Sequence, residues 1–288
     1  MKQHAFIVRE LTMRELRRKY ARSALGILWS VLNPLLSMAV LSLIFSGMFR
    51  RSIENYPIYY LCGYLIWQMF TAATMASISV FADNRALLLK AKLSPELFLI
   101  ARVMTAFVNL LFSLIAFAAV LIVFAIPFHA GMLLIPLIFV LLLGFALGIS
   151  YLLACAYVSF GDVRHLYTVV LTLWMYCSAI FYPITQLQGI ARTLVAFNPL
   201  YSYIEAFRII VLEQALPPSP LLARMLFWCL LSLGAGRICY ARLHGSLMQR
   251  LYRRDREDHR RRDAAVACAQ RAGAGAVGAV CRSDSAAG

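Results

Sequence analysis

The sequence lacks the motifs of several enzyme classes. It contains no G-x-x-x-x-G-K-[ST] loop to hold a nucleotide phosphate, no H-E-x-x-H segment and no cysteine pair with ligand spacing. Its cysteines are scattered, and a buried thiol is favoured over a disulfide or a zinc site for those in or beside apolar runs, which are Cys62, Cys155, Cys177, Cys229 and Cys239. We therefore expect no catalytic residue, no metal site and no cofactor bound by this chain itself.

Acidic residues are scarce, with 13 Asp and Glu against 28 Lys and Arg. Proton-coupled transporters usually place carboxylates or histidines inside their membrane spans, whereas the apolar runs here are nearly free of carboxylates, so proton coupling is disfavoured. Arg102 is nearly the only charge within a run. The cations gather between and outside the runs, which indicates membrane topology rather than nucleic-acid binding.

Apolar residues, in contrast, are abundant. They make up 62% of the chain, with a mean hydropathy of +0.74, against about 45–50% in soluble domains. Six runs are long enough to cross a bilayer, at about 25–49, 58–81, 96–126, 132–160, 166–182 and 221–240. We predict an all-α polytopic membrane protein with six transmembrane helices in a single domain, 1–251. The segment 252–288, rich in Arg, Asp, Ala and Gly, is expected to be a disordered tail.

The distribution of cations predicts the orientation. The N-terminal segment is basic and has no apolar signal-peptide region with a cleavage site, so we expect it to stay cytoplasmic and uncleaved. With both termini in the cytoplasm, the outside would hold few cations, namely Arg50, Arg51, Arg192, Arg208 and Arg224. This bias follows the positive-inside rule.

The N-terminal segment has the pattern of an amphipathic helix. Its apolar face would consist of Phe6, Met13, Leu16, Tyr20 and Ala24, while cations that include Arg14 and Arg18 occupy the rest of the circumference. We expect this helix to lie in the cytoplasmic interface of the membrane. It could serve as an anchor or as a platform for a soluble partner, and the pattern does not separate the two.

A second amphipathic helix is predicted at 82–96, on the cytoplasmic side. Asp83 or Asn84 can cap it, and its leucines alternate imperfectly with Arg85, Lys90 and Lys92. Ser94 and Pro95 then fit the N-cap and first turn of the next membrane helix.

The stretch 183–220 is too rich in proline and polar residues to be an ordinary span. It holds two short amphipathic pieces, near 187–197 and 201–212, which predict an external or re-entrant helical hairpin. Within it, Glu205 and Arg208 are three residues apart, and a local ion pair is favoured over a gate.

Three further features have alternative interpretations. Gly144 and Gly148 predict close helix packing rather than a ligand role. Asp162, Arg164 and His165 indicate a polar turn rather than a catalytic trio, because no nucleophile is suitably spaced. Aromatic residues near the outer ends of the second and fifth runs could line a conduit for sugars or form an interfacial belt; they are Tyr59, Tyr60, Tyr64, Trp67, Trp174, Tyr176, Phe181 and Tyr182.

Several segments together resemble the ABC-2 permease family, and more narrowly the inner-membrane permeases of capsular polysaccharide exporters. They are the basic N-terminal helix, LGILWSVLNPLLSMAV, SIENYPIYYLCGYLIW, the 82–96 helix, FGDVRHLY, VVLTLWMY, FYPI and FNPLYSYIEAFR. The likeness runs from Met1 to about Leu251 and does not include the tail. ATP-independent lipid-linked sugar flippases and membrane-embedded transferases remain alternatives, but both would need ionisable groups within the spans.

The resemblance implies a half-transporter without enzymatic activity of its own. Two copies would form the conduit, two copies of a cytoplasmic ABC ATPase would bind ATP and Mg, and the cargo would be a lipid-linked polysaccharide crossing the bacterial inner membrane. Periplasmic or outer-membrane export components would receive it, and no nucleic acid is involved. Residues implied in coupling to the ATPase are Asp83, Arg85, Leu87, Lys90, Leu93, Arg14 and Arg18. Residues implied in the conduit or its gate are Tyr59, Tyr64, Trp67, Trp174, Tyr182, Asn198, Glu205 and Arg208.

Overall fold

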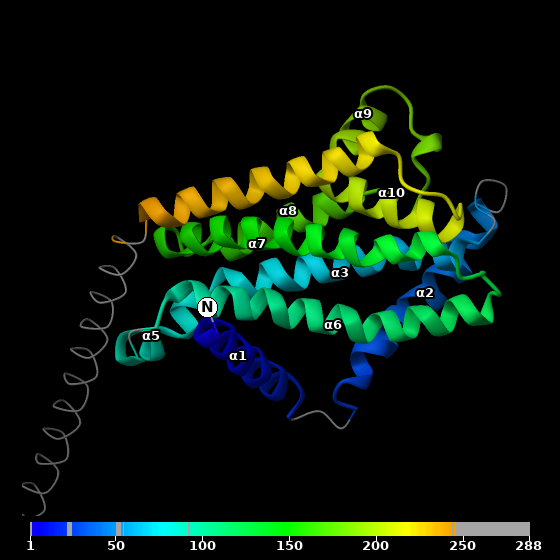
Figure 1. Cartoon of the computed structure of the whole chain (residues 1–288). Helices are drawn as coiled ribbons and strands as arrows, with labels where there is room; N and C mark the ends of the chain where they lie inside the picture. Colours follow the sequence, from blue (N-terminus) through cyan, green and yellow to red (C-terminus); the bar gives the residue numbers. More distant parts are fainter. Residues whose placement is uncertain are drawn as a thin grey trace, which may run out of the picture. The chain divides into compact units, whose positions relative to one another are not determined.

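The computed structural model describes residues 2–21, 25–49, 53, 55–91, 93–243 and 245. The chain divides into two compact units, 1–242 and 243–288. Nearly all of the second unit, including the predicted tail at 252–288, lies outside the described residues. The first unit is a bundle of helices (Figure 1).

Helices make up the ordered structure, and no strand occurs among the described residues. The elements are α1 (Lys2–Tyr20), α2 (Leu28–Phe49), α3 (Tyr56–Ile78), α4 (Val80–Asp83), α5 (Arg85–Ala91), α6 (Pro95–Val123), the 3-10 turn η1 (Ala130–Leu134), α7 (Ile135–Ser159), α8 (Val163–Tyr176), η2 (Ile184–Gln186), α9 (Gly189–Phe197) and α10 (Pro199–Leu212). A last helix covers Ser219–Leu243.

Five of the described helices are long and apolar enough to cross a membrane: α2, α3, α6, η1 with α7, and the last helix. The pair α9 and α10, bent by 83° at Asn198, would make a sixth if counted as one broken span. The predicted all-α polytopic membrane architecture is confirmed, and the bent pair matches the two short pieces predicted at 183–220.

The fifth predicted run, 166–182, does not form a span-length helix. Its helix, α8, has 14 residues, which at 1.5 Å per residue is about 21 Å, less than the roughly 30 Å of a bilayer core. The helix ends at Tyr176, and Ala179 adopts a left-handed φ of 47° that an α-helix cannot continue. Composition predicted the apolar run correctly but not the point at which the helix stops.

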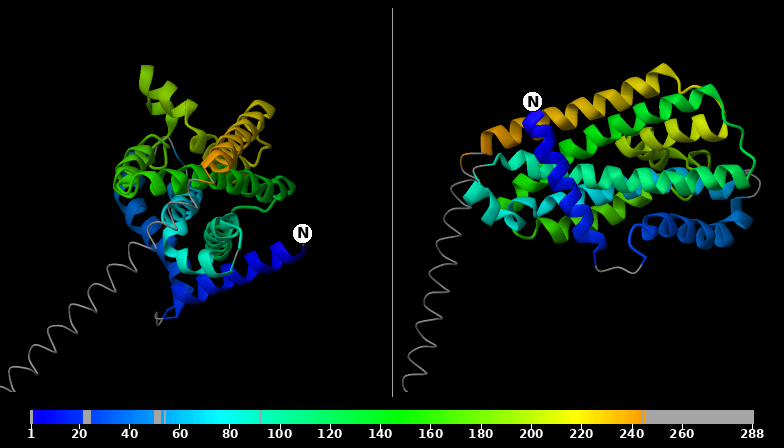
Figure 2. Two further views of the ribbon diagram at one scale, coloured as in Figure 1. Left: turned by 90° about the vertical axis from the view of Figure 1, so that its left-hand side faces the viewer. Right: turned by 60° about the horizontal axis from the view of Figure 1, so that its bottom comes forward.

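The centre of the bundle is α3, which packs against α2, α6, α7 and α10. Phe70 of α3 stacks on Phe145 of α7 with ring centroids 5.5 Å apart, and Tyr203 of α10 lies against the same Phe145. Outside this core, α1 lies obliquely across α6 (Figure 2). By contrast, only 6% of the residues in the α2 span are buried, so most of α2 faces outward.

Glycines allow α7 and the last helix to approach closely. A Cβ at Gly148 would lie 2.3 Å from the carbonyl carbon of Ser232, and one at Gly144 would lie 2.6 Å from the Cys229 sulfur. The prediction of close packing by these two glycines is therefore confirmed.

The cysteines of the described residues form no disulfide. Cys62, Cys155 and Cys229 are buried, as predicted, whereas Cys177 is exposed and Cys239 is half-buried. The same part of the chain contains no group of three metal-ligating side chains.

Candidate functional site

A cluster of charged side chains joins α1 to the bundle where α1 crosses α6. Arg102 of α6 makes an ion pair of 2.9 Å with Glu15 of α1 and a longer one of 3.5 Å with Asp83 of α4. Arg14 pairs with the other oxygen of Glu15 at 3.1 Å. Glu15 is only 7% exposed, so these cations offset the cost of burying its carboxylate.

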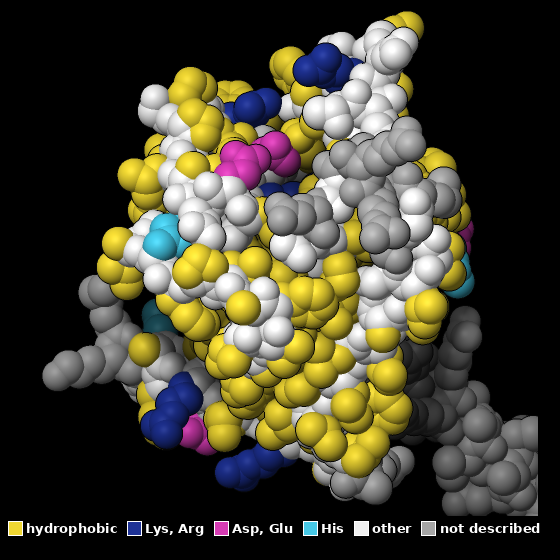
Figure 3. Space-filling view, turned by 90° about the vertical axis from the view of Figure 1, so that its right-hand side faces the viewer, with side chains coloured by type: hydrophobic (Ala, Val, Ile, Leu, Met, Phe, Trp, Pro, Cys, Tyr) yellow, Lys and Arg dark blue, Asp and Glu magenta, His cyan; other side chains and the backbone are white. Residues whose placement is uncertain are grey.

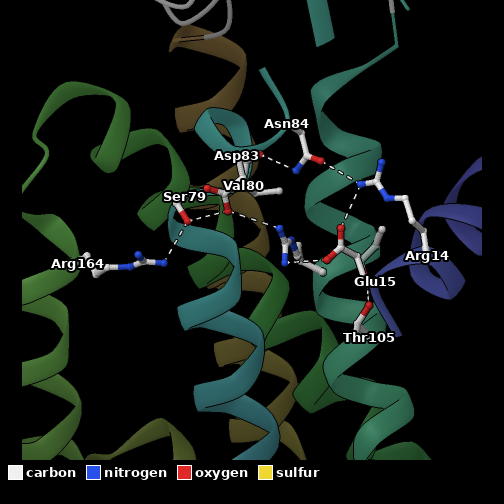
Figure 4. Close-up of polar contacts among 10 residues, drawn as sticks. Arg14, Glu15, Ser79, Val80, Asp83, Asn84, Thr105 and Arg164 are labelled. Atoms are coloured by element: carbon white, nitrogen blue, oxygen red, sulfur yellow. Dashed lines mark hydrogen bonds and ion pairs between the residues drawn. The ribbon is translucent and has the colours of Figure 1, made fainter. Parts of the chain in front are cut away.

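Hydrogen bonds extend this cluster in two directions (Figure 4). Arg14 donates to the side-chain oxygen of Asn84 at 3.0 Å. On the other side, Arg164 of α8 donates to the Ser79 hydroxyl at 3.1 Å, and that hydroxyl donates to Asp83 at 3.0 Å. We call these seven residues the charge network; they are Arg14, Glu15, Ser79, Asp83, Asn84, Arg102 and Arg164. The charge network ties together α1, α4, α6 and α8, and it ends at the residue before α5.

The cap predicted for the second amphipathic helix is only partly correct. Asn84 does precede α5, and its carbonyl accepts hydrogen bonds from the N–H groups of Leu87 and Leu88. Its side chain, however, binds Arg14 and donates to the Val80 carbonyl, and Asp83 binds Ser79 and Arg102. The side chains of this junction therefore fix α5 to the bundle rather than cap it.

The seven predicted coupling residues are distributed around this junction. Asp83 and Arg14 belong to the charge network, while Arg18 lines a cavity beside it. Leu87 is 41% exposed on α5. Arg85, the first residue of α5, and Leu93, two residues beyond its end, are half-buried, and the side chain of Lys90 is not among those described. Their role in coupling stays a prediction.

Sequence reasoning missed Glu15, Arg102 and Arg164 as members of a site. A signal was present, since a lone arginine in an apolar run requires a partner, and Glu15 is one of two acids in a basic segment. These two signals indicate that Arg102 needs a partner and that an acid is available on the N-terminal segment, but they do not identify the pair.

The face of α1 that contacts the bundle also differs from the predicted apolar stripe. Leu11, Thr12 and Glu15 are buried, whereas Phe6 and Met13 are exposed. Ala24 is outside the described residues. Tyr20 of the stripe also contacts the bundle, because its hydroxyl hydrogen-bonds to Asn109 of α6 and Ser30 of α2. The charge network and Tyr20 together dock α1, and Phe6 and Met13 are left exposed.

Replacing Arg102 by methionine is expected to lower the free energy of unfolding by about 3 kcal/mol, because Glu15 would stay buried with one of its two cations removed. Adding Glu15→Gln should restore part of that loss, since it removes the uncompensated charge. Thermal unfolding of the purified protein in detergent measures both variants. A double variant that is less stable by the sum of the two single effects would contradict the direct pairing.

At the other end of the bundle, Arg208 of α10 is buried, with 3% exposed. Its guanidinium donates to the carbonyls of Tyr59, Ala179 and Ile180 at 3.3, 3.0 and 3.0 Å and lies 3.5 Å from the centre of the Tyr59 ring. No ion pair with Glu205 is found among the described residues, so the predicted local pair is wrong. The α10 turn instead directs Arg208 toward the loop 177–182.

Asn198 secures the same loop from the bend between α9 and α10. Its side chain donates to the Cys177 carbonyl at 2.8 Å, accepts from the Trp174 indole at 2.8 Å, and caps α10 through the N–H of Leu200 at 3.0 Å. Tyrosine hydroxyls complete the arrangement. Tyr59 donates to the Tyr182 carbonyl, Tyr56 to the Phe181 carbonyl and Tyr182 to the Tyr176 carbonyl.

Five of the eight residues predicted for the conduit or gate are thus brought together around the loop 177–182: Tyr59, Trp174, Tyr182, Asn198 and Arg208. Tyr64 instead packs beside Tyr60, and Trp67 is buried next to Phe70. A cavity of about 290 Å³ at this end is lined by Tyr59, Glu205 and Arg208, together with Tyr201 and Glu213. Acidic side chains gather beside a hollow on this face (Figure 3). A conduit role for the eight stays a prediction.

Comparison with known proteins agrees with this architecture. The ABC-2 type transporter family matches residues 8–212. The O-antigen export system permease protein RfbA of Myxococcus xanthus is 32% identical over 77% of this chain and 86% of its own length, and an RfbA of Klebsiella pneumoniae is 27% identical over 69% and 77%. The polysialic acid transport protein KpsM of Escherichia coli is 23% identical over 81% and 92%. The chain belongs to the ABC-2 type transporter family.

Proposed function

We propose that the chain is the transmembrane subunit of an ATP-driven exporter that moves a lipid-linked cell-surface polysaccharide, capsular or related, across the bacterial inner membrane. Family membership and the names of the relatives support transport of a polysaccharide. The observation that carries the proposal is the charge network, because it connects α1, α4, α6 and α8 and ends at Asn84, the residue directly before α5. A force applied to α5 would reach all of them.

ATP hydrolysis is assigned to a separate cytoplasmic ABC ATPase, two copies of which would bind ATP and Mg. The sequence has no phosphate-binding loop of its own, and α5 offers the exposed Leu87 beside the buried Leu88. Both termini and α5 would lie in the cytoplasm, as the placement of cations favours. Periplasmic or outer-membrane components would accept the cargo.

A second copy of the chain is the proposed partner within the membrane. Apolar side chains stand exposed along α2 and α8, among them Leu36, Val40 and Leu43 on α2 and Leu166, Val169 and Leu173 on α8. Lipid and a second copy can share these surfaces. An ATP-independent flippase or a transferase is less well supported, because the buried Arg208 is already held by backbone carbonyls and the half-buried Arg102 pairs with Glu15 and Asp83.

Replacing Leu87 by aspartate is expected to reduce co-purification of the ATPase subunit at least tenfold, since a charge would enter an apolar contact. The bundle itself should be unaffected because this side chain faces outward. The measurement is the ratio of ATPase to permease after affinity purification of a tagged permease. Ile190→Asp is the matched control, because Ile190 is 80% exposed on α9. Full retention of the ATPase by the Leu87 variant would refute coupling through α5.

A further inference from the structure

Two adjoining cavities form a groove between α1, α2, α3 and α6. The first, about 530 Å³, lies beside the charge network, and the second, about 370 Å³, continues it toward α2. They share Lys19, Ala72, Ala106 and Asn109, and we call them together the polar groove. Each volume lies in the range of small-molecule sites in proteins, about 300–1,000 Å³.

The first cavity carries an excess of hydrogen-bond donors. Its two carboxylates, Glu15 and Asp83, are already paired with Arg14 and Arg102. Two other cations at this cavity, Arg18 and Lys19, make no ion pair with any residue that the structure describes, although Lys19 lies 5.4 Å from the Tyr20 ring. The Nε atom of Arg102 is buried and has no hydrogen-bond partner among the described residues. The complementary ligand is an anion with several acceptor oxygens.

Charge decreases along the groove. Polar residues of α6 follow one another at spacings of three and four, Arg102, Thr105, Asn109 and Ser113, so they lie on one face of the helix. The three residues after Arg102 form hydrogen bonds within the protein. Thr105 and Ser113 donate to backbone carbonyls, and Asn109 accepts from Tyr20. Among the described residues that line the second cavity only Lys19 is charged, and the others include the apolar Trp29, Met69 and Leu110 beside the neutral polar Asn33 and Gln68. A ligand that is anionic at one end and uncharged at the other matches this decrease in charge.

We infer that the polar groove binds the phosphate headgroup of a lipid, with Arg18, Lys19 and Arg102 as its donors. Arginine and lysine are the side chains that proteins use to bind phosphate, and a basic helix in the interface lies at headgroup depth. The inference does not depend on transport, so its failure would leave the proposed function intact.

Binding of phosphatidylglycerol to the full chain in detergent, followed by native mass spectrometry with phosphatidylcholine as the reference lipid, tests the site. Arg18→Gln combined with Lys19→Gln should weaken binding at least tenfold. Arg9→Gln combined with Arg17→Gln removes the same charge from exposed positions of α1 that line neither cavity, and it should weaken binding no more than about threefold. Equal weakening of phosphatidylglycerol binding by the two double variants would overturn the proposed site.

A variant without a charge change guards against misfolding as the explanation. Ala72→Met would fill the groove from α3 and should also weaken phosphatidylglycerol binding at least tenfold, and wild-type binding by this variant would overturn the site. Inorganic pyrophosphate as a competitor then separates the two sources of phosphate. Displacement of the lipid at equal concentration assigns the site to a free phosphate compound, whereas no displacement assigns it to a lipid headgroup.

Discussion

Replacing Arg208 by leucine is expected to lower the free energy of unfolding by about 4 kcal/mol. The leucine can fill the buried space, but it leaves the loop carbonyls of Ala179 and Ile180 without their donors, whereas the Tyr59 carbonyl keeps its bond within α3. Each buried acceptor left unpaired costs about 1–3 kcal/mol. Thermal unfolding in detergent, together with the monodisperse fraction after size-exclusion chromatography, measures the loss.

Two variants make that result specific. Arg192→Leu changes the same side chain at an exposed position of α9 and should leave the stability within about 0.5 kcal/mol. Arg208→Lys keeps the charge but not the planar fork of donors. Its free energy of unfolding should therefore lie between those of the Arg208→Leu and Arg192→Leu proteins. Equal stability of the Arg208→Leu and Arg192→Leu proteins would show that the guanidinium does not hold the loop 177–182.

Replacing Gly148 by alanine should separate α7 from the last helix and destabilise the protein by about 3 kcal/mol or more. The added methyl group would lie 2.3 Å from the Ser232 carbonyl carbon and 2.5 Å from the Leu233 nitrogen. These are backbone atoms, which cannot rotate away as a side chain can. Gly236 repeats the close approach from the other helix, where a Cβ would lie 2.4 Å from the Gly148 oxygen.

Gly234 provides the opposite expectation within the same last helix. A Cβ there meets nothing within 4 Å, so Gly234→Ala should leave the stability unchanged or raise it by up to about 1 kcal/mol through helix propensity. Melting temperatures of the two alanine variants, measured side by side in one detergent, compare them directly. A melting temperature of the Gly148→Ala protein equal to or above that of the Gly234→Ala protein would rule out the close contact of Gly148 with the last helix.

Hydropathy predicted most of the helices because a membrane span needs only length and apolar composition. It could not predict that α8 stops at Tyr176, since the residues after it are just as apolar as those before. The family resemblance located the region around α5, and Asp83 and Arg14 both belong to the charge network there, Asp83 through Arg102 and Arg14 through Asn84.

The partners within the site were harder to predict. Glu15 and Arg102 are far apart in the sequence, and nothing local to either residue indicates that α1 crosses α6 at that point. Arg208 was misassigned for a different reason. Spacing along one helix suggested Glu205 as its partner, but backbone carbonyls of a distant loop have no side-chain signature in the sequence.

The early end of α8 has a consequence for the depth of the chain in the bilayer. Arg164 fixes the start of α8 at the charge network, and about 21 Å of helix does not reach across roughly 30 Å of hydrocarbon. With the charge network at one face of the bilayer, the loop 177–182 begins within the hydrocarbon, where water is not available to bind peptide groups. Side chains replace that water, and the carbonyls they bind belong to Tyr176, Cys177, Ala179, Ile180, Phe181 and Tyr182. The side chains of tyrosine, asparagine and arginine thus supply the hydrogen bonds that water would otherwise give to this short stretch of irregular backbone.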